Sequence, residues 1–462
     1  MKRNKKMKNL IVKLDSIKMN NFKNVIKSEI AFSDKGKILN TIGIYGQNGS
    51  GKTAVVESIN ILKSLLMGIP FQKDLYYYIN ICSNELLLDY KFIVNREKEE
   101  YSVKYLVKFE RDSKFNSEKN IEEKGVILSR EKIEIYDTNE KLLAHIDFKK
   151  DKRKTSVIYA DCNVEDSDEI ISNDIAMAAA HISSQLSKTV IFQDMFRENI
   201  KKSLLLKNIL NGMNFYATAN LFVIGMKETS LISAIDNLPL SIRASKGNNS
   251  IAFGTIPLNM FAPSMIPSAI LETITPELEK INIVMRQLVP GIKIGYKKIN
   301  EGLDKNGNTI ATIQLVSIIG ESQIPLKYES EGVKKLIALC SVLIEMYNNE
   351  AVCLVVDELD SGIFEYLLGE LVKILHDGAK GQLIFTSHNL RLLEVLPKQC
   401  IIFSTINPQK SFIKMANVKP NHNLRDFYYR TILLGGQKEE LYNETDEYEI
   451  ERALRKWQTQ KS

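Results

Sequence analysis

The sequence predicts a mixed α/β fold, and three observations indicate it. A glycine-rich loop at residues 46–53 lies between a β-favouring stretch and a helical pattern. A continuous apolar run at residues 351–356 ends in an acidic pair, which is typical of a buried parallel strand. Short β-rich segments, separated by charged turns, fill residues 85–160 and predict an antiparallel meander. We therefore expect a parallel sheet covered by helices, together with a β-meander lobe.

The composition is that of a globular protein. Of the 462 residues 44% are hydrophobic and 26% are charged, and the net charge of +6 is too small to indicate nucleic-acid binding by itself. No apolar run approaches the ~20 residues of a membrane-spanning helix, and the basic N-terminus lacks the apolar core of a secretory signal. The five cysteines are scattered and the five histidines lack metal-ligand spacing, so we expect free buried thiols and no zinc site. These features predict a soluble, cytoplasmic protein without a membrane partner.

The glycine-rich loop carries the strongest functional signal. It matches G-x-x-x-x-G-K-[ST] in full, with Gly46, Gln47, Asn48, Gly49, Ser50, Gly51, Lys52 and Thr53. The glycines let backbone N–H groups turn toward a phosphate, and the N-terminus of the following helix adds partial positive charge. Lys52 can reach the β and γ phosphates, and Thr53 can bind Mg²⁺. The loop therefore predicts a nucleotide site that takes ATP and Mg²⁺.

Two further segments supply the second half of such a site. Asp357 ends the apolar run and is placed to bind Mg²⁺ through water, and Glu358 follows it as a base for the attacking water. The alternative is an acidic pair that only caps a helix. His388 follows a second apolar strand at residues 381–387, and there it can sense a γ-phosphate. The alternative for this histidine is a structural role.

Together these motifs resemble those of the ABC-type ATPase heads of the SMC, RecF and OLD-like group. The resemblance is carried by LDSIKMNNFKNV at residues 14–25, GQNGSGKT at 46–53, YESEGVKKLIAL at 328–339, and DELDSGI followed by TSHN at 357–389. It implies an α/β P-loop NTPase of the ABC head type, with an antiparallel β-meander lobe and a compact helical insertion. It also implies ATP hydrolysis.

The segment at 328–339 has two interpretations. From the residues alone, Ser330 is a plausible N-cap of an apolar-periodic helix. The resemblance implies that Ser330 and Gly332, with Lys334 in the basic place, form a signature motif that faces the γ-phosphate bound by a second copy. Asp360 and Ser361 would then be contacts across the dimer interface. Heads of this type hydrolyse ATP only as head-to-head dimers around two ATP–Mg.

Some parts of the pattern depart from the group or stay open. Lys23, in the opening turn, touches the nucleotide according to the resemblance, and the alternative is a solvated surface lysine. Gln185 and Gln193 lie in a helical stretch and are poor candidates for a Q-loop glutamine. Tyr328 and Glu329 stand where many relatives have a leucine.

The motifs divide the chain into three parts. Residues 1–165 form the N-terminal half of the head with the P-loop and the meander, and residues 291–462 form the C-terminal half with the signature, the acidic pair and the switch histidine. Residues 166–290 are expected to be a compact helical insertion or arm, including a helix over 220–235. A hairpin is predicted over 291–327. Two strands and two closing helices are predicted after His388.

Three functions fit this interpretation. We favour an ATPase that forms a homodimer or higher homo-oligomer and serves as the sensor or regulatory subunit of an anti-phage defence system. Its partner would be a separately encoded effector such as a Toprim-type nuclease, as the resemblance suggests. The first alternative is a RecF-like repair ATPase that binds duplex DNA, which the basic N-terminal tail at residues 2–8 permits. The second is an ATP-switched binding module, against which Glu358 argues because a pure switch could dispense with a base.

Overall fold

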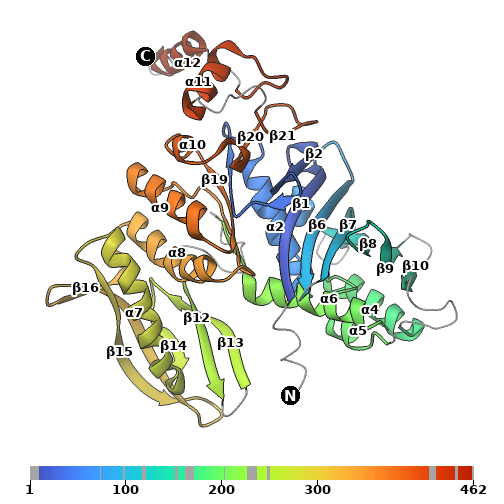
Figure 1. Ribbon diagram of the computed structural model, residues 1–462, viewed down its shortest axis with the longest axis horizontal. Helices are drawn as coiled ribbons and strands as arrows, with labels where there is room; N and C mark the ends of the chain where they lie inside the picture. The colour runs from blue at the N-terminus through green and yellow to red at the C-terminus, as the bar shows by residue number, and fades with distance from the viewer. Residues whose placement is uncertain are drawn as a thin grey trace.

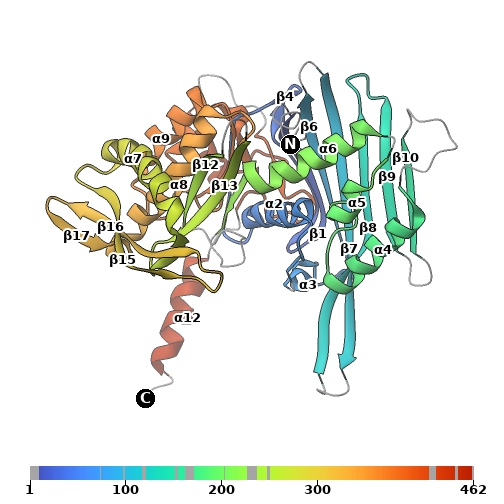
Figure 2. The ribbon, with the colours of Figure 1, turned by 90° about the horizontal axis from the view of Figure 1, so that it is seen from below.

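The structure is a computed structural model in which helix α2 (Lys52–Met67) lies between two large sheets (Figures 1 and 2). It describes residues 10–72, 74–96, 99–116, 121–150, 155–161, 171–201, 203–225, 237–246, 250–415, 423–442 and 446–459. The mixed α/β class expected from the sequence is confirmed.

The first sheet has six strands in the order β11-β18-β19-β5-β20-β21, and all neighbours are parallel except β20 and β21. Its strands are β5 (Thr41–Tyr45), β11 (Leu221–Ile224), β18 (Cys353–Val356), β19 (Gln382–Ser387), β20 (Ile401–Ser404) and β21 (Phe412–Ile413). The first five are buried along their whole length, as expected for parallel strands covered on both faces. Because β19 lies between β5 and β18, the carboxyl ends of these three strands meet at one edge of the sheet.

The second sheet is antiparallel and has seven strands in the order β10-β9-β8-β7-β6-β1-β2. They are β1 (Leu10–Phe22), β2 (Val25–Ala31), β6 (Glu85–Arg96), β7 (Glu99–Asn116), β8 (Ile121–Tyr136), β9 (Leu142–Lys150) and β10 (Thr155–Asp161). Along most of β6 every second side chain is buried, from Leu86 to Val94, so the sheet has one face on the core. The expected meander is confirmed, and its β7–β8 hairpin projects beyond the rest of the sheet (Figure 2).

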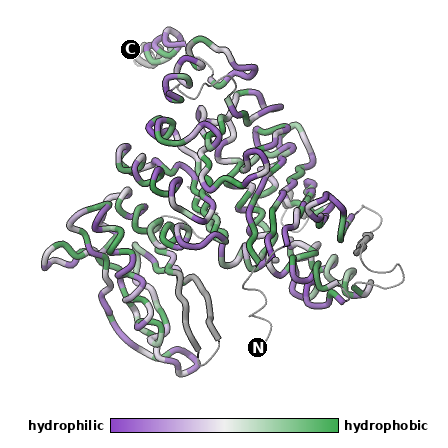
Figure 3. The backbone as a smooth tube through the Cα atoms, viewed as in Figure 1, coloured by the Kyte–Doolittle hydropathy of each residue, from purple (hydrophilic) through white to green (hydrophobic). Residues whose placement is uncertain are grey.

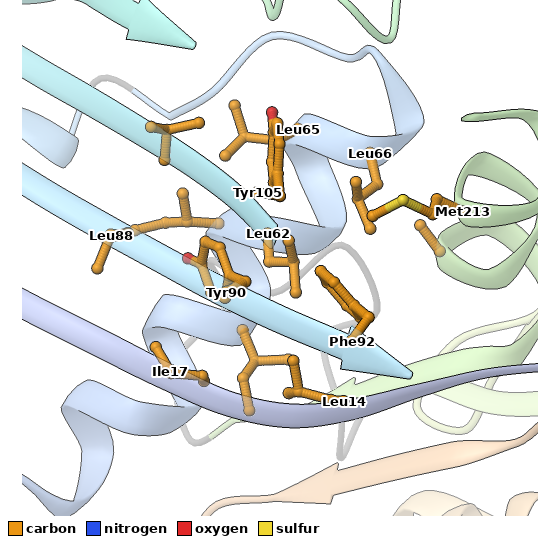
Figure 4. Close-up of a cluster of buried hydrophobic side chains, with 14 of the residues drawn as sticks. Leu14, Ile17, Leu62, Leu65, Leu66, Leu88, Tyr90, Phe92, Tyr105 and Met213 are labelled. Atoms are coloured by element: carbon orange, nitrogen blue, oxygen red, sulfur yellow. The ribbon is translucent and has the colours of Figure 1, made fainter. Parts of the chain in front are cut away.

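Helix α2 fills the space between the sheets. Figure 4 shows its leucines, Leu62, Leu65 and Leu66, among aromatic side chains of the antiparallel sheet. The buried Tyr90 hydroxyl donates to the carbonyl oxygen of Ser58 at 2.7 Å, which fixes the helix on β6. The P-loop that precedes α2 is thereby held by both sheets.

The middle of the chain differs in part from the expectation. Helices α4 (Asn173–Leu186), α5 (Asp194–Glu198) and α6 (Leu204–Phe215) are present, and a π-helical turn follows at Tyr216–Asn220. The helix predicted over 220–235 is wrong at its start, because β11 pairs with β18 there, and residues 226–236 lie outside the described residues. A short apolar run fits a strand or a helix equally well, and the neighbouring strand decided between them. The segment expected as an insertion thus contributes one strand to the parallel sheet.

A smaller lobe follows in the chain. Its elements are β12 (Asn237–Lys246), β13 (Ser250–Asn259), β14 (Ser264–Pro267), α7 (Leu271–Leu288), β15 (Lys293–Leu303), β16 (Thr309–Ile319) and β17 (Ser322–Pro325). The strands β12 and β13, within the segment expected to be helical, form an antiparallel hairpin. The hairpin predicted over 291–327 is confirmed by β15 and β16. Helix α7 packs on β15 and on helix α8 (Glu331–Asn348).

The remaining elements are short or peripheral. They are α3 (Leu75–Tyr78), β3 (Ser33–Asp34), β4 (Lys37–Ile38), α9 (Glu365–Gly378), α10 (Leu392–Val395), α11 (Leu424–Leu434) and α12 (Glu447–Thr459). The two closing helices predicted from the sequence are α11 and α12, and α12 projects from the body of the molecule (Figure 2). Along the outer helices hydrophobic and hydrophilic residues alternate (Figure 3), as expected for helices with one face on a core.

Two expectations from composition can be compared with the structure. In the described ranges, no helix is long and apolar enough to cross a membrane. Cys340, Cys353 and Cys400 are free and buried as expected, whereas Cys82 is free but exposed. Cys162 lies outside the described residues.

Candidate nucleotide site

The residues singled out in the sequence meet at the carboxyl edge of the parallel sheet. The P-loop follows β5, Asp357 follows β18, and Thr386 lies near the end of β19. The hydroxyl oxygen of Thr53 lies 3.5 Å from the Oδ1 atom of Asp357, although 304 positions separate them in the chain. The edge where strands end is the place where open α/β sheets bind ligands.

The P-loop has a backbone that requires its glycines. Gly46, Gly49 and Gly51 have φ angles of 153°, 81° and 101°, which are unfavourable for residues with a side chain. A Cβ atom on Gly46 would lie 1.9 Å from the Ser404 hydroxyl oxygen at the end of β20. Gly51 is the N-cap of α2 and makes no side-chain hydrogen bond to the first turn of this helix. The partial positive charge of the helix N-terminus therefore favours an anion at the loop.

Lys52 is buried in the loop itself. Its ammonium donates to the carbonyl oxygens of Gly46 at 2.7 Å and Gln47 at 2.9 Å. Burial lowers its pKa to about 8, against the opposing effect of Asp357, Glu358 and Asp360. A phosphate at the loop would offer this ammonium a charged acceptor in place of neutral carbonyls.

Thr386 orders the two acidic residues. Its hydroxyl donates to Oδ1 of Asp357 at 2.6 Å and accepts from the backbone N–H of Glu358 at 2.7 Å. Glu358 has a φ of 47°, in the left-handed region that non-glycine residues adopt at a cost of ~1 kcal/mol or more. This turn directs the Asp357 and Glu358 side chains differently, since Asp357 is buried and Glu358 is half-buried.

The donor set fits a magnesium ion. The Thr53 hydroxyl and the Asp357 carboxylate offer two oxygen ligands, and Mg²⁺ is commonly held by one or two protein groups together with substrate phosphates and water. Within the described part of the chain, no cluster of three or more His, Cys, Asp or Glu residues could hold a metal ion. The arrangement therefore suits a metal that arrives with a nucleotide.

His388 and Asp360 lie beside one another. The backbone N–H of His388 donates to the Asp360 carboxylate, at 3.3 Å to Oδ1 and 3.2 Å to Oδ2. Burial and the Lys52 ammonium lower the pKa of His388, which the nearby carboxylates oppose. Its imidazole is therefore neutral near pH 7 and has one N–H to donate.

The predicted signature segment begins helix α8. Ser330 is the N-cap, and its hydroxyl accepts from the N–H of Val333 at 3.3 Å, so the prediction of an N-cap is confirmed. Ser330 is exposed, whereas Gly332 is buried against Gly362 of the loop that contains Asp360 and Ser361. The Lys334 ammonium is buried and binds Glu331 at 2.6 Å.

The opening turn contacts the P-loop through Asn24, a residue that was not predicted from the sequence. Lys23 forms an ion pair with Glu57 of α2, and its ammonium lies 4.3 Å from the centre of the Tyr78 ring. The amide of Asn24 instead donates to the carbonyl oxygen of Gly49 in the loop. The predicted role of Lys23 at a nucleotide stays a prediction.

Sequence reasoning therefore missed Asn24, Thr386 and Ser404, which all touch the P-loop or the acidic pair. Thr386 and Ser404 each lie at the carboxyl end of an apolar strand, and that position was the available signal. A cavity of about 370 Å³ beside the loop is lined by Asn24, Gln47, Asn48, Gly49, Ser50, Thr405, Ile406, Pro408 and Ser411. Of the two glutamines considered poor Q-loop candidates, Gln193 is buried and donates to Ala179 and Thr189 carbonyls.

Comparison with known proteins gives matches in solved structures alone. No protein-family model matches the chain, and no curated protein matches it. The SMC head domain from Thermotoga maritima matches with a TM-score of 0.36 and 15% identity, over 87% of this chain and 99% of that one. An Smc head domain with an extended coiled coil, bound to the C-terminal domain of ScpA and derived from Pyrococcus furiosus, matches with a TM-score of 0.40 and 11% identity, over 88% and 97%. The recombination mediator RecF with ATP matches with a TM-score of 0.37 and 14% identity, over 88% and 98%.

Proposed function

We propose that this chain binds ATP–Mg²⁺ and hydrolyses ATP. The observation that carries the proposal is the meeting of Thr53 and Asp357 at 3.5 Å, with Lys52 in the same loop. A hydroxyl and a carboxylate at this spacing, beside a glycine loop and an uncapped helix N-terminus, suit a metal-bound triphosphate. Glu358, the next residue, is the base that would orient the attacking water.

Isothermal titration with ATP–Mg²⁺ and a phosphate-release assay test this function. Lys52→Ala is expected to abolish measurable binding and hydrolysis, because the lysine contacts the terminal phosphates. Lys373→Ala, which removes an exposed lysine of α9, is the matched control and should leave both unchanged. Unaltered ATP affinity in Lys52→Ala would overturn the assignment of the loop.

The active form in this proposal is a head-to-head dimer. Two aromatic side chains are exposed next to the segments that would face a partner: Tyr328 is 68% exposed two residues before Ser330, and Phe364 is 74% exposed three residues after Ser361. Large apolar side chains left on a surface favour contact with another molecule. Light scattering should show dimers of the wild-type chain with ATP–Mg²⁺. Phe364→Ser should weaken them, and Tyr448→Ser, on the projecting helix α12, should not.

The wider role we propose is that of a sensor or regulatory subunit acting with a separately encoded effector, such as a Toprim-type nuclease in anti-phage defence. The motif resemblance in the sequence supports this role. Co-expression with the product of the adjacent reading frame, followed by affinity purification with and without ATP, tests it. A nuclease that co-purifies with wild type and not with Lys52→Ala is the expected result. Salt-sensitive binding of duplex DNA without any partner would instead support a repair ATPase.

A further inference from the structure

Lys335 joins the signature helix to the loop that carries the acidic pair. It lies on helix α8, which packs against β18, and its side chain is buried. Its ammonium donates to the carbonyl oxygen of Glu358 at 2.5 Å and to that of Ser361 at 3.1 Å. The motif found in the sequence includes the preceding lysine, Lys334, and gives Lys335 no role.

Lys334 shows that the arrangement is specific. The two lysines are adjacent and both are buried, but Lys334 contacts Glu331 and the Phe261 ring, where its ammonium lies 4.5 Å from the ring centre. Lys335 alone of this pair reaches the turn after β18. The matched control is Lys63 of α2, a buried lysine that lies outside this turn and also donates to a backbone carbonyl oxygen.

The backbone of Glu358 is held at both ends. Its N–H donates to the Thr386 hydroxyl at 2.7 Å, while its carbonyl oxygen accepts from the Ser361 N–H at 3.0 Å and from Lys335. This residue also has the unfavourable φ of 47°. A strained backbone conformation persists only where surrounding contacts hold it in place. Among such contacts, hydrogen bonds from a charged donor are stronger than those between neutral groups. Without the lysine the carbonyl would lose its charged partner.

Burial of the ammonium has a cost that the contacts must offset. Desolvation lowers the pKa of Lys335 to about 8, while Asp360, Glu358 and Asp357 favour its charged form. A buried ammonium is costly unless it is paired, so the neighbouring carbonyl oxygens and carboxylates stabilise the charged form of Lys335.

We propose that Lys335 is a positioning residue: it fixes the turn at Glu358 and Ser361, and so orients the Glu358 carboxylate for hydrolysis. It also ties that turn to the helix that begins at Ser330. The inference rests on the proposed ATPase function. Lys335 itself does not touch the nucleotide in this proposal, so its loss should affect the chemical step and leave nucleotide binding intact.

The test compares steady-state ATP hydrolysis by wild type, Lys335→Met, Lys335→Arg and Lys63→Met. For Lys335→Met we expect kcat to fall by about 10- to 100-fold with little change in KM or in the ATP affinity from titration, as for a displaced catalytic group. Lys335→Arg keeps the charge and the donors and should recover most of the rate. Lys63→Met removes a buried ammonium away from this turn and should retain the wild-type kcat.

Each outcome separates the possibilities. If Lys335→Met hydrolyses ATP as the wild type does, or loses binding and kcat together, the positioning role is overturned. Equal loss in Lys63→Met and Lys335→Met would also overturn it, because the loss of any buried ammonium would then have the same effect. Where Lys335→Met fails to fold, as judged by thermal unfolding, Lys335→Gln provides the same comparison with a neutral donor retained. Absence of hydrolysis in wild type would instead reject the ATPase function itself.

Discussion

Gly332 packs so closely on the backbone of Gly362 that it has no room for a side chain. A Cβ atom on Gly332 would lie 1.8 Å from the carbonyl oxygen of Gly362, and Gly362 itself has a φ of 75°. The signature helix and the loop after the acidic pair therefore touch through backbone within one chain. The need for glycine at position 332 follows from this contact, before any second copy is considered.

Gly332→Ala is therefore expected to destabilise the folded chain by about 1–3 kcal/mol, the usual cost of an overpacked core position. Urea denaturation measures the change in the free energy of unfolding. Gly302→Ala is the control, because a Cβ atom there meets no atom within 4 Å. If the two variants are equally stable, the loop moves aside easily and the contact does not restrain α8.

This contact shows what the sequence could and could not provide. Local patterns were enough to predict the P-loop, the apolar strand before Asp357 and the N-cap at Ser330, because each depends on neighbours in the chain. The partner of Gly332 lies thirty positions away, and nothing in the segment DELDSGI to which it belongs pairs it with Gly332. The sequence could not reveal that contact.

The difference between local patterns and contacts distant in the chain also explains which parts of the structure were predicted wrongly or missed. Residues 221–224 become a strand because β18 lies beside them, and an apolar run of four cannot specify that alone. Thr386 and Lys335 both hold the backbone of Glu358, which is distant from each of them in the chain, so their residue types alone do not reveal that role. The contacts of the Lys23 ammonium with Glu57 and the Tyr78 ring could not be predicted for the same reason.

Glu358→Gln should slow ATP hydrolysis by about 10²–10⁴-fold, the usual loss when a general base is removed, while ATP binding is retained. The isosteric amide keeps both backbone hydrogen bonds that hold the turn: the N–H of residue 358 donates to the Thr386 hydroxyl, and its carbonyl oxygen accepts from Lys335. Phosphate release in single-turnover experiments measures the rate, and titration measures affinity. Because ATP persists in this variant, its dimer should be easier to isolate.

Glu365→Gln provides the control for that experiment, since Glu365 is an exposed residue of the first turn of α9. It should hydrolyse ATP at the wild-type rate. A wild-type rate in Glu358→Gln would show that Glu358 is not the base.

ATP binding should take up a proton above about pH 8. Burial lowers the pKa of Lys52 from 10.5 to about 8 in the unbound chain, and phosphate charges would favour the protonated form. Binding at pH 9 therefore takes up a proton, whereas at pH 7 the lysine already carries it, and affinity should fall up to tenfold per pH unit above 8. Titration in buffers of different ionisation enthalpy measures the uptake.

The sign for stability is opposite to that for binding. The pKa of Lys52 in the folded chain lies below its value in the unfolded chain, so the unfolded chain binds more protons between pH 8 and 10.5. The cost of burying this lysine in the folded state therefore decreases as pH rises through that window.

Lys335 titrates over the same range, with a pKa of about 8. Lys335→Met is therefore the control, and it should keep the proton uptake on binding. If Lys335→Met no longer takes up a proton on binding ATP, the proton is taken up by Lys335 and the assignment to Lys52 is wrong.

Ser330 allows the shared-site prediction to be tested without disturbing Gly332. Aspartate is as good an N-cap as serine, so Ser330→Asp should retain the stability of α8 while repelling a phosphate presented by a second copy. Ser330→Ala loses the cap and should cost ~1 kcal/mol of stability without adding charge. If Ser330 acts only as a cap, Ser330→Ala should be the less stable of the two variants.

If Ser330 instead completes the partner's site, Ser330→Asp should bind ATP as a monomer and fail to hydrolyse it. Lys52→Ala fails in the site of its own chain, so a mixture of the two variants forms heterodimers with one intact site. That site takes Lys52 from the Ser330→Asp chain and Ser330 from the Lys52→Ala chain, and part of the wild-type rate should return. A mixture that stays inactive, although light scattering shows heterodimers, would mean that the two sites act only together. Normal hydrolysis by Ser330→Asp alone would instead show that each chain completes its own site.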